Sequence, residues 1–150
     1  MNEFPHIYKV GAEGGPEGLV RLSGPNLELI ETTPPPQFGG PEGQWSPETL
    51  LVASVADCFI LTFRAIARAS RLEWQGLQCA VDGKLERLDR VTRFTNFHLR
   101  ATFQVPADTR MEKAERLLHK AEAGCLVTNS LSADIQLDTT IEIVSNQHPG

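Results

Sequence analysis

The sequence predicts an α+β fold in which short strands precede a long helix and longer strands follow it. Gly and Pro divide the first third of the chain into short runs, a long apolar segment begins at Ser46, and residues 74–105 alternate between apolar and polar side chains. Apolar residues make up 41% of the 150 residues, enough for a hydrophobic core. We therefore expect a single domain over residues 1–150, with the element order β-β-β-α-β-β-α-β.

Three short strands are predicted in the first third. They cover His6–Val10, Leu19–Leu22 and Leu27–Ile30, and Gly-containing turns separate them. Residues 34–43 are rich in Pro and Gly, so they form neither a helix nor a central strand. We expect an ordered loop there, running across the surface.

A long helix is predicted from Ser46 to about Ser70. Serine is a favoured N-cap residue, and Pro47 suits the first helical position. Residues 50–63 are apolar or small nearly all round the helix, so protein must cover every face of it. One chain of this length has little with which to do so. We infer that a second copy supplies part of the cover, in an intertwined homodimer with central buried helices.

The rest of the chain predicts two long strands, a second helix and a last strand. The strands Trp74–Arg87 and Phe94–Val105 flank a hairpin at Leu88-Asp89-Arg90. The helix that follows ends at Gly124, and its inward residues are Met111, Ala114, Leu117, Leu118 and Ala121. After a turn at residues 128–132, the last strand is predicted from the alternation of Ile135, Leu137, Thr139, Ile141 and Ile143.

Composition argues against several classes of function. A net charge of −5 disfavours a nucleic-acid or anionic-membrane partner. The start of the chain lacks a secretory pattern, and the apolar stretch Leu50–Phe63 is too short to span a bilayer. Neither the three cysteines nor the four histidines have metal-ligand spacing, so we expect no metal and no cofactor. Free thiols in a reducing, cytoplasmic compartment remain.

The three cysteines differ in their predicted surroundings. Cys58 lies in the middle of the long helix, where its neighbours on the same face are Ser54, Leu61, Thr62 and Ala65. Cys125 follows the end of a helix, at a turn whose free backbone amides can stabilise a thiolate. Cys79 alternates in phase with apolar neighbours and is predicted to fill the core. Position alone leaves two simpler interpretations open: Cys58 is a small buried side chain without a reactive role, and Cys125 is a loop cysteine that occurs there by chance.

Four segments together resemble the OsmC/Ohr family, the osmotically inducible protein C and organic hydroperoxide resistance proteins. The segments are Phe38-Gly39-Gly40, residues 45–51, Ala56-Asp57-Cys58-Phe59 and residues 120–131. They occur in the family's order over nearly the whole chain. The helix motif around Cys58 and the Gly-Cys-x-Val-x-Asn turn are specific in combination, whereas either alone is weak.

The resemblance implies an enzyme that reduces organic hydroperoxides with thiols. Cys58 would attack the peroxide and become a sulfenic acid, Cys125 would close a disulfide with it, and a dithiol reductant of the lipoyl type would reopen the disulfide. Glu48 matches the family's acidic residue. It lies roughly 15 Å along the helix from Cys58 and about 80° around it, so it can approach only the Cys58 of a partner subunit. Alternatively, Glu48 is a first-turn carboxylate that the helix dipole favours.

The sequence departs from the family at an arginine. Peroxide-reducing members carry it in the early Gly-rich loop or directly before Phe-x-Gly, but residues 14–18 contain no arginine and residue 37 is Gln. Without it, Cys58 in an apolar setting is expected to have a raised pKa and to react slowly. Arg21 has two interpretations: it substitutes for the missing cation, or it is a solvated charge on a strand. His119 likewise acts as a base for a thiol or is an exposed helix residue.

Two alternatives to the peroxidase therefore stay open. The first is a non-peroxidatic binding module that holds a small hydrophobic ligand in the same interface pocket. The second is a thiol redox sensor that forms its disulfide slowly.

Overall fold

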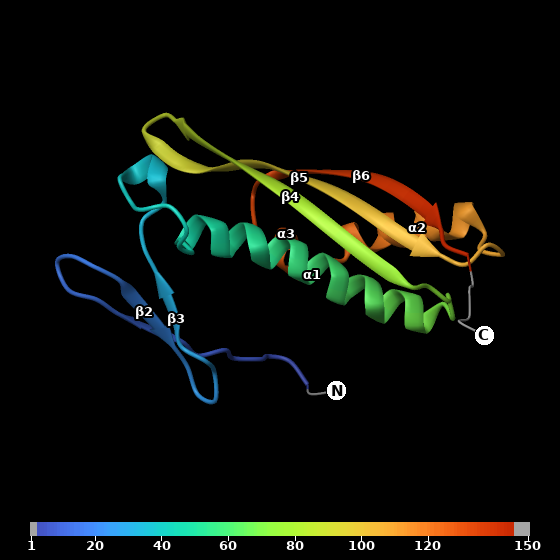
Figure 1. The fold of residues 1–150 in the computed structure, drawn as a ribbon, viewed down its shortest axis with the longest axis horizontal. Helices are drawn as coiled ribbons and strands as arrows, with labels where there is room; N and C mark the ends of the chain where they lie inside the picture. The colour runs from blue at the N-terminus through green and yellow to red at the C-terminus, as the bar shows by residue number, and fades with distance from the viewer. Residues whose placement is uncertain (1–2, 146–150) are drawn as a thin grey trace. The chain divides into compact units, whose positions relative to one another are not determined.

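The computed structural model describes residues 3–145, and the chain divides into two compact units between Leu51 and Val52. The division falls inside the long helix α1 (Pro47–Ala69). The α+β class is confirmed, with two small sheets and the predicted helices (Figure 1). A 3₁₀ turn, η1, and a short helix, α3, add to the predicted order.

The first unit contains an antiparallel sheet of β1 (Gly11–Glu13), β2 (Val20–Ser23) and β3 (Ile30–Thr32), in that order. The middle strand was predicted nearly correctly. The predictions for the first and third strands were wrong, because these strands lie further along the chain than His6–Val10 and Leu27–Ile30. The pairing of β1 with β2, rather than the apolar run before it, sets the position of the first strand.

A tight loop follows β3. Residues Pro36–Phe38 form η1, and Gly39 after it has a φ of 87°, which favours glycine. The N–H of Gly40 donates to the Pro35 carbonyl oxygen over 3.1 Å. A Cβ atom on Gly40 would lie 1.7 Å from the Pro34 carbonyl oxygen, so only glycine fits without a change in the backbone. The loop is ordered as predicted, with η1 as its only helical turn among the described residues.

Ser46 caps the start of α1 as predicted. The Thr49 N–H donates to Ser46 Oγ over 3.1 Å, and the Ser46 N–H donates to Thr49 Oγ1 over 2.8 Å. This reciprocal pair has the geometry of a capping box, with Thr in place of the usual Glu or Gln. The backbone N–H groups of Ser46 and Thr49 are therefore satisfied locally.

One stripe of α1 is buried, rather than its whole circumference. The buried residues are Val55, Cys58, Phe59, Phe63 and Ala67. Leu61, three residues after Cys58, is 51% exposed. At 23 residues and a mean hydropathy of 1.9, α1 is, among residues 3–145, the one helix whose length and composition would allow it to cross a membrane. The expectation that the apolar stretch is too short to span a bilayer was therefore wrong for the helix as folded, although the core helices of soluble proteins meet the same criterion of length and composition.

The second unit has a three-stranded sheet in the order β4 (Gly76–Leu88), β5 (Val91–Val105), β6 (Asp134–Ile143). The β4–β5 hairpin turns at Asp89 and Arg90, which both have positive φ as a two-residue hairpin requires. Strand β6 pairs parallel to β5. The connection between them carries α2 (Met111–Ala123) and α3 (Leu126–Asn129).

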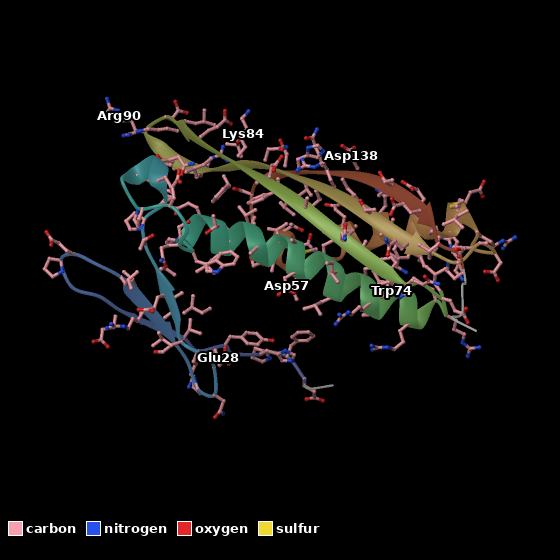
Figure 2. The ribbon with its side chains drawn as sticks, in the orientation of Figure 1. Glu28, Asp57, Trp74, Lys84, Arg90 and Asp138 are labelled. Carbon is pink, nitrogen blue, oxygen red and sulfur yellow. The ribbon has the colours of Figure 1, made fainter. Side chains whose placement is uncertain are left out.

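Helices α1 and α2 cover one face of this sheet (Figure 1). Phe63 of α1 packs edge-to-face against Phe103 of β5 and Trp74, with ring centroids 4.8 and 5.5 Å away. On the opposite face, Lys84 and Asp138 project into solvent (Figure 2). The predicted inward face of α2 is buried except at Met111, which is 40% exposed because it begins the helix at the edge of the layer.

The last strand agrees with its predicted alternation except at its end. Ile143 is 52% exposed, because β6 finishes there and the inward phase ends with it. The core therefore lies between the sheet and the two helices, and the cysteines border it.

Candidate functional site

Cys58 lies on the buried stripe of α1. Its side chain is 9% exposed, and Thr62, one turn later, places Oγ1 3.7 Å from the Cys58 sulfur. Because residues four apart face the same side of a helix, the spacing alone brings this hydroxyl to the thiol. The thiol thus has a polar neighbour within an otherwise apolar stripe.

Cys125 is the N-cap residue of α3, directly after Gly124 ends α2 as predicted. Its side chain is 1% exposed. A Cβ atom on Gly124 would lie 3.7 Å from Thr62 Cγ2, so the corner between α2 and α3 packs against the turn of α1 that carries Cys58. Two segments far apart in the sequence meet here.

The two thiols are in direct contact. The Cys125 side chain hydrogen-bonds to the Cys58 sulfur, and the backbone N–H groups of Leu126 and Val127 donate to the same sulfur. Neither thiol is in a disulfide. The corner therefore presents three donors to Cys58, in addition to Thr62.

These donors reverse the predicted ionisation of Cys58. Burial alone raises the pKa of this thiol, but the Val127 N–H, the Cys125 thiol, Thr62 and the Leu126 N–H lower it, and the net pKa lies below its ordinary value. The expectation of a raised pKa was therefore wrong. It considered only side-chain charges, whereas backbone amides stabilise the thiolate here.

Cys125 shifts in the opposite direction. Burial raises its pKa, and donation of its proton to the Cys58 thiolate raises the pKa further, while the N–H and hydroxyl of Thr128 partly offset the rise. Of the two thiols, Cys58 therefore loses its proton first, and its thiolate then accepts a hydrogen bond from the Cys125 thiol. The free amides were expected to stabilise Cys125 itself; the Thr128 N–H does so, whereas the N–H groups of Leu126 and Val127 are directed at Cys58.

The third thiol, Cys79, is half-buried on β4, in phase with the inward residues as predicted. Burial raises its pKa to about 11, and the nearby Cys125 adds to the rise. Cys79 is thus a neutral packing residue at physiological pH.

The two other predicted candidates have charged partners of their own. Arg21 Nε lies 3.6 Å from Glu31 Oε2, across the β2–β3 pair, and both side chains are largely exposed. His119 Nε2 lies 3.3 Å from Glu115 Oε1 on the exposed side of α2. These contacts favour the reading of both residues as surface charges.

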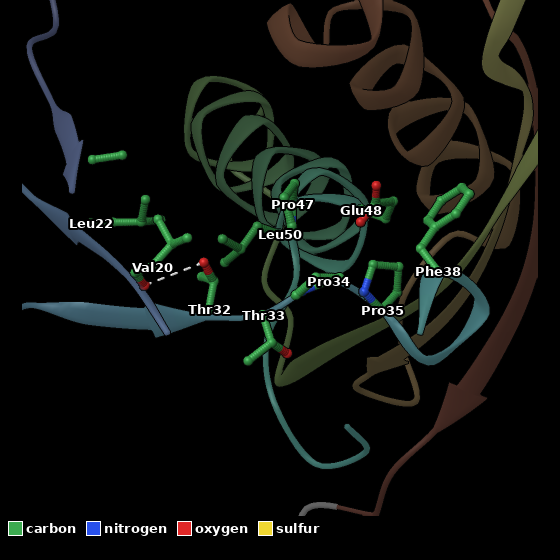
Figure 3. Close-up of a pocket in the computed structure, with 11 residues that line it drawn as sticks. Val20, Leu22, Thr32, Thr33, Pro34, Pro35, Phe38, Pro47, Glu48 and Leu50 are labelled. Atoms are coloured by element: carbon green, nitrogen blue, oxygen red, sulfur yellow. Dashed lines mark hydrogen bonds between the residues drawn. The ribbon is translucent and has the colours of Figure 1, made fainter. Parts of the chain in front are cut away.

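Glu48 lines a cavity of about 540 Å³ in the first unit (Figure 3). The other lining residues are Ala12, Val20, Leu22, Thr32, Thr33, Pro34, Pro35, Phe38, Pro47 and Leu50. Glu48 Oε1 is buried, and no residue that the structure describes hydrogen-bonds to it. Within the same helix, ten positions separate Glu48 from Cys58.

Residues 3–145 contain no group of three or more His, Cys, Asp or Glu side chains placed to hold a metal ion. The reactive groups that the site brings together are the thiols of Cys58 and Cys125. Sequence reasoning missed the role of Thr62 and the aim of the Leu126 and Val127 amides. The i, i+4 spacing from Cys58 could have indicated the role of Thr62. No residue type indicates the direction of a backbone N–H, so the two amides could not be predicted.

Comparisons with known proteins identify similar chains. The family model described as OsmC-like protein matches residues 39–140. The Bacillus subtilis (strain 168) protein YmaD, described as uncharacterized, is 24% identical over 136 residues, which are 88% of this chain and 90% of that protein.

Two solved structures share the fold. An OsmC-like protein from Mycoplasma pneumoniae has a TM-score of 0.78 at 15% identity, over 92% of this chain and 99% of that one. The organic hydroperoxide resistance protein OsmC from Legionella pneumophila has a TM-score of 0.73 at 21% identity, over 94% and 100%.

Proposed function

The chain belongs to the family of OsmC-like proteins, and we propose that it reduces organic hydroperoxides with Cys58 and Cys125 as its thiol pair. Family membership, together with the name of the Legionella neighbour, supports a redox or stress-response role. The observation that carries the specific proposal is the hydrogen bond between the two thiols on a sulfur that also accepts two backbone N–H groups.

In the first step, the Cys58 thiolate attacks the distal peroxide oxygen of ROOH. The O–O bond breaks, an S–O bond forms, and the departing alkoxide takes up one proton to give ROH. Cys58 is oxidised by two electrons to a sulfenic acid while the hydroperoxide is reduced to an alcohol. The lowered pKa of Cys58 increases the fraction of the thiolate, which is the nucleophile, relative to an ordinary cysteine.

In the second step, the Cys125 thiol condenses with the sulfenic acid to form a disulfide and water. Because the two side chains are already in contact, this reaction precedes further oxidation of Cys58. A dithiol, of the lipoyl type by family resemblance, then transfers two electrons and two protons and restores both thiols. A reducing, cytoplasmic setting suits this cycle.

A homodimer completes the proposal. Helix α1 leaves Leu61 half exposed, and a second copy of the chain packed on this apolar surface would cover it. In such a dimer we assign Glu48 of one subunit as a supporting acid toward Cys58 of the other, because its position on the helix keeps it from its own Cys58. Sedimentation at several protein concentrations tests the dimer, and Leu61→Arg is expected to dissociate it.

The thiol chemistry is tested by adding one equivalent of cumene hydroperoxide to the fully reduced protein. We expect rapid loss of two thiols and two mass units from the intact chain, and no such loss of mass in Cys58→Ser. Survival of all three thiols for minutes would refute the peroxidase. A disulfide that forms with diamide but not with the peroxide would instead identify the slow redox sensor.

The second candidate function is the binding module for a small hydrophobic ligand. The cavity of the first unit favours it, because its volume of about 540 Å³ and its mostly apolar lining are typical of small-molecule pockets. An apolar compound that co-purifies with the protein, combined with unreactive thiols, would establish this function in place of the first.

A further inference from the structure

The cavity of the first unit contains a polar atom that the protein itself does not satisfy. Glu48 Oε1 is buried there, and it is one of two buried side-chain oxygens without a partner in residues 3–145. Figure 3 shows the carboxylate between Pro47 and Phe38, whose side chains have no hydrogen-bond donor. Burying a carboxylate oxygen without a hydrogen bond is costly, so a donor is expected from outside the chain.

The other oxygen without a partner is Thr33 Oγ1. Its side chain lines the same cavity but points away from Glu48 in Figure 3. Thr32 Oγ1 already donates to the Val20 carbonyl oxygen over 3.4 Å. Neither threonine therefore serves as the missing donor, and Glu48 is the polar anchor of the cavity.

No basic residue is available near Glu48 in the sequence. Residues 22–63 contain no Lys, Arg or His, and none of the eleven lining residues is basic. Arg21, the last cation before this stretch, is paired with Glu31. A carboxylate that lacks a cation of its own protein in an apolar cavity is complementary to a cation carried by a ligand.

We propose that this cavity binds an apolar amine, whose ammonium group donates to Glu48 and whose hydrocarbon part fills the space among the prolines, Leu22, Leu50 and Phe38. An ammonium supplies charge and up to three donors, and a charge-assisted hydrogen bond is about twice as strong as a neutral one. A neutral hydrocarbon would leave Oε1 unsatisfied, and a carboxylate would be repelled. The site is thus selective for the head group as well as for apolar character, and in the dimer proposed above the bound amine would lie beside Cys58 of the partner subunit.

Three probes of similar shape separate these possibilities: 2-phenylethylamine, 2-phenylethanol and 3-phenylpropanoate. Titration calorimetry on the full chain at pH 7 is expected to rank the amine above the alcohol by at least roughly tenfold in affinity, since hydrogen bonds to charged groups contribute about 1.5–3 kcal/mol. No binding of the carboxylate is expected. Equal affinity for amine and alcohol, or binding of the carboxylate alone, would overturn the proposal, as would the absence of binding by all three probes.

Two variants locate the effect. Glu48→Gln keeps the side-chain shape and is expected to lower amine affinity at least roughly tenfold, while affinity for the alcohol stays within about twofold and reports an intact cavity. Glu42→Gln removes one charge from an exposed position in the loop before α1 and serves as the matched control. Unchanged amine binding in Glu48→Gln would refute the assignment of the site.

The peroxide assay described above separates this proposal from the peroxidase. If the thiols prove unreactive toward peroxide while the amine still binds through Glu48, only the proposed reaction fails.

Discussion

The hydrogen bond from Cys125 to Cys58 predicts opposite outcomes for two nearly isosteric substitutions. Cys125→Ala removes the donor, whereas Cys125→Ser replaces it with a hydroxyl that can donate to the same sulfur. Because the bond stabilises only the thiolate form of Cys58, its loss raises the pKa of Cys58. The alanine variant should therefore ionise at higher pH than the unmodified chain, and the serine variant should remain close to it.

The size of the effect follows from the number of donors. A hydrogen bond contributes about 1 kcal/mol net, which corresponds to roughly fivefold less thiolate at pH values below the midpoint. The Leu126 and Val127 amides and Thr62 remain in place, so the alanine variant keeps part of the stabilisation. Alkylation of Cys58 by iodoacetamide, followed by site-resolved mass spectrometry from pH 5 to 10, measures the thiolate fraction directly.

The shape of the pH profile decides the outcome. An alanine profile that coincides with that of the unmodified chain would show that the thiol contact does not stabilise the thiolate. A serine profile that follows alanine would show that the sulfur, rather than donation, matters. Slower alkylation by the same factor at every pH would point to altered access to Cys58, since ionisation affects only the range below the midpoint.

Three further predictions concern the packing around the two candidate sites. Burial raises the pKa of Cys79 from its ordinary 9.0 to about 11, so the unfolded chain releases this proton at lower pH than the folded chain does. The contribution of Cys79 to the free energy of unfolding is therefore complete below pH 9 and falls toward pH 11, by up to about 2–3 kcal/mol. Urea unfolding at each pH measures this fall, and Cys79→Val should flatten it. Phe63→Ala should lower the free energy of unfolding by about 3–5 kcal/mol in the same assay, whereas Arg64→Ala, at an exposed position, should lower it by less than about 0.5 kcal/mol. A loss below about 1 kcal/mol for Phe63→Ala would contradict the packing described. Gly40→Ala should shift the loop backbone at a cost of about 1–3 kcal/mol, seen as faster exchange of the amides that donate to the Pro35 carbonyl oxygen, and unchanged exchange would rule out the close approach.

The second half of the chain was predictable because its elements bury one regular face each. The alternation of the long strands and the 3.6-residue period of α2 both follow from contact with the core. The first third was less predictable. Ile7, Tyr8 and Val10 are more than three-quarters exposed, so the apolar run that suggested a strand makes no core contact. The parallel pairing of β6 was missed, although a connection containing a helix favours it.

The identity of the thiol pair could be predicted only through resemblance, since 66 residues separate Cys58 from Cys125 in the sequence. The ionisation of Cys58 could not be predicted in this way, because every residue has a backbone N–H and only folding decides where it points. Glu48 is an intermediate case. The lack of basic residues from 22 to 63 is visible in the sequence, but the cavity around the carboxylate is not.

The missing arginine now has two separate consequences. At Cys58 its electrostatic task, stabilising an anion, can be performed by neutral donors, because a thiolate needs hydrogen bonds more than it needs a formal counter-charge. At Glu48 the same absence is not compensated, because no donor of the described chain reaches Oε1. Loss of the arginine therefore leaves the nucleophile capable of ionising and leaves a carboxylate open to an external cation. It follows that restoring a cation beside Glu48, for example with Gln37→Arg, should weaken amine binding, which calorimetry with 2-phenylethylamine measures.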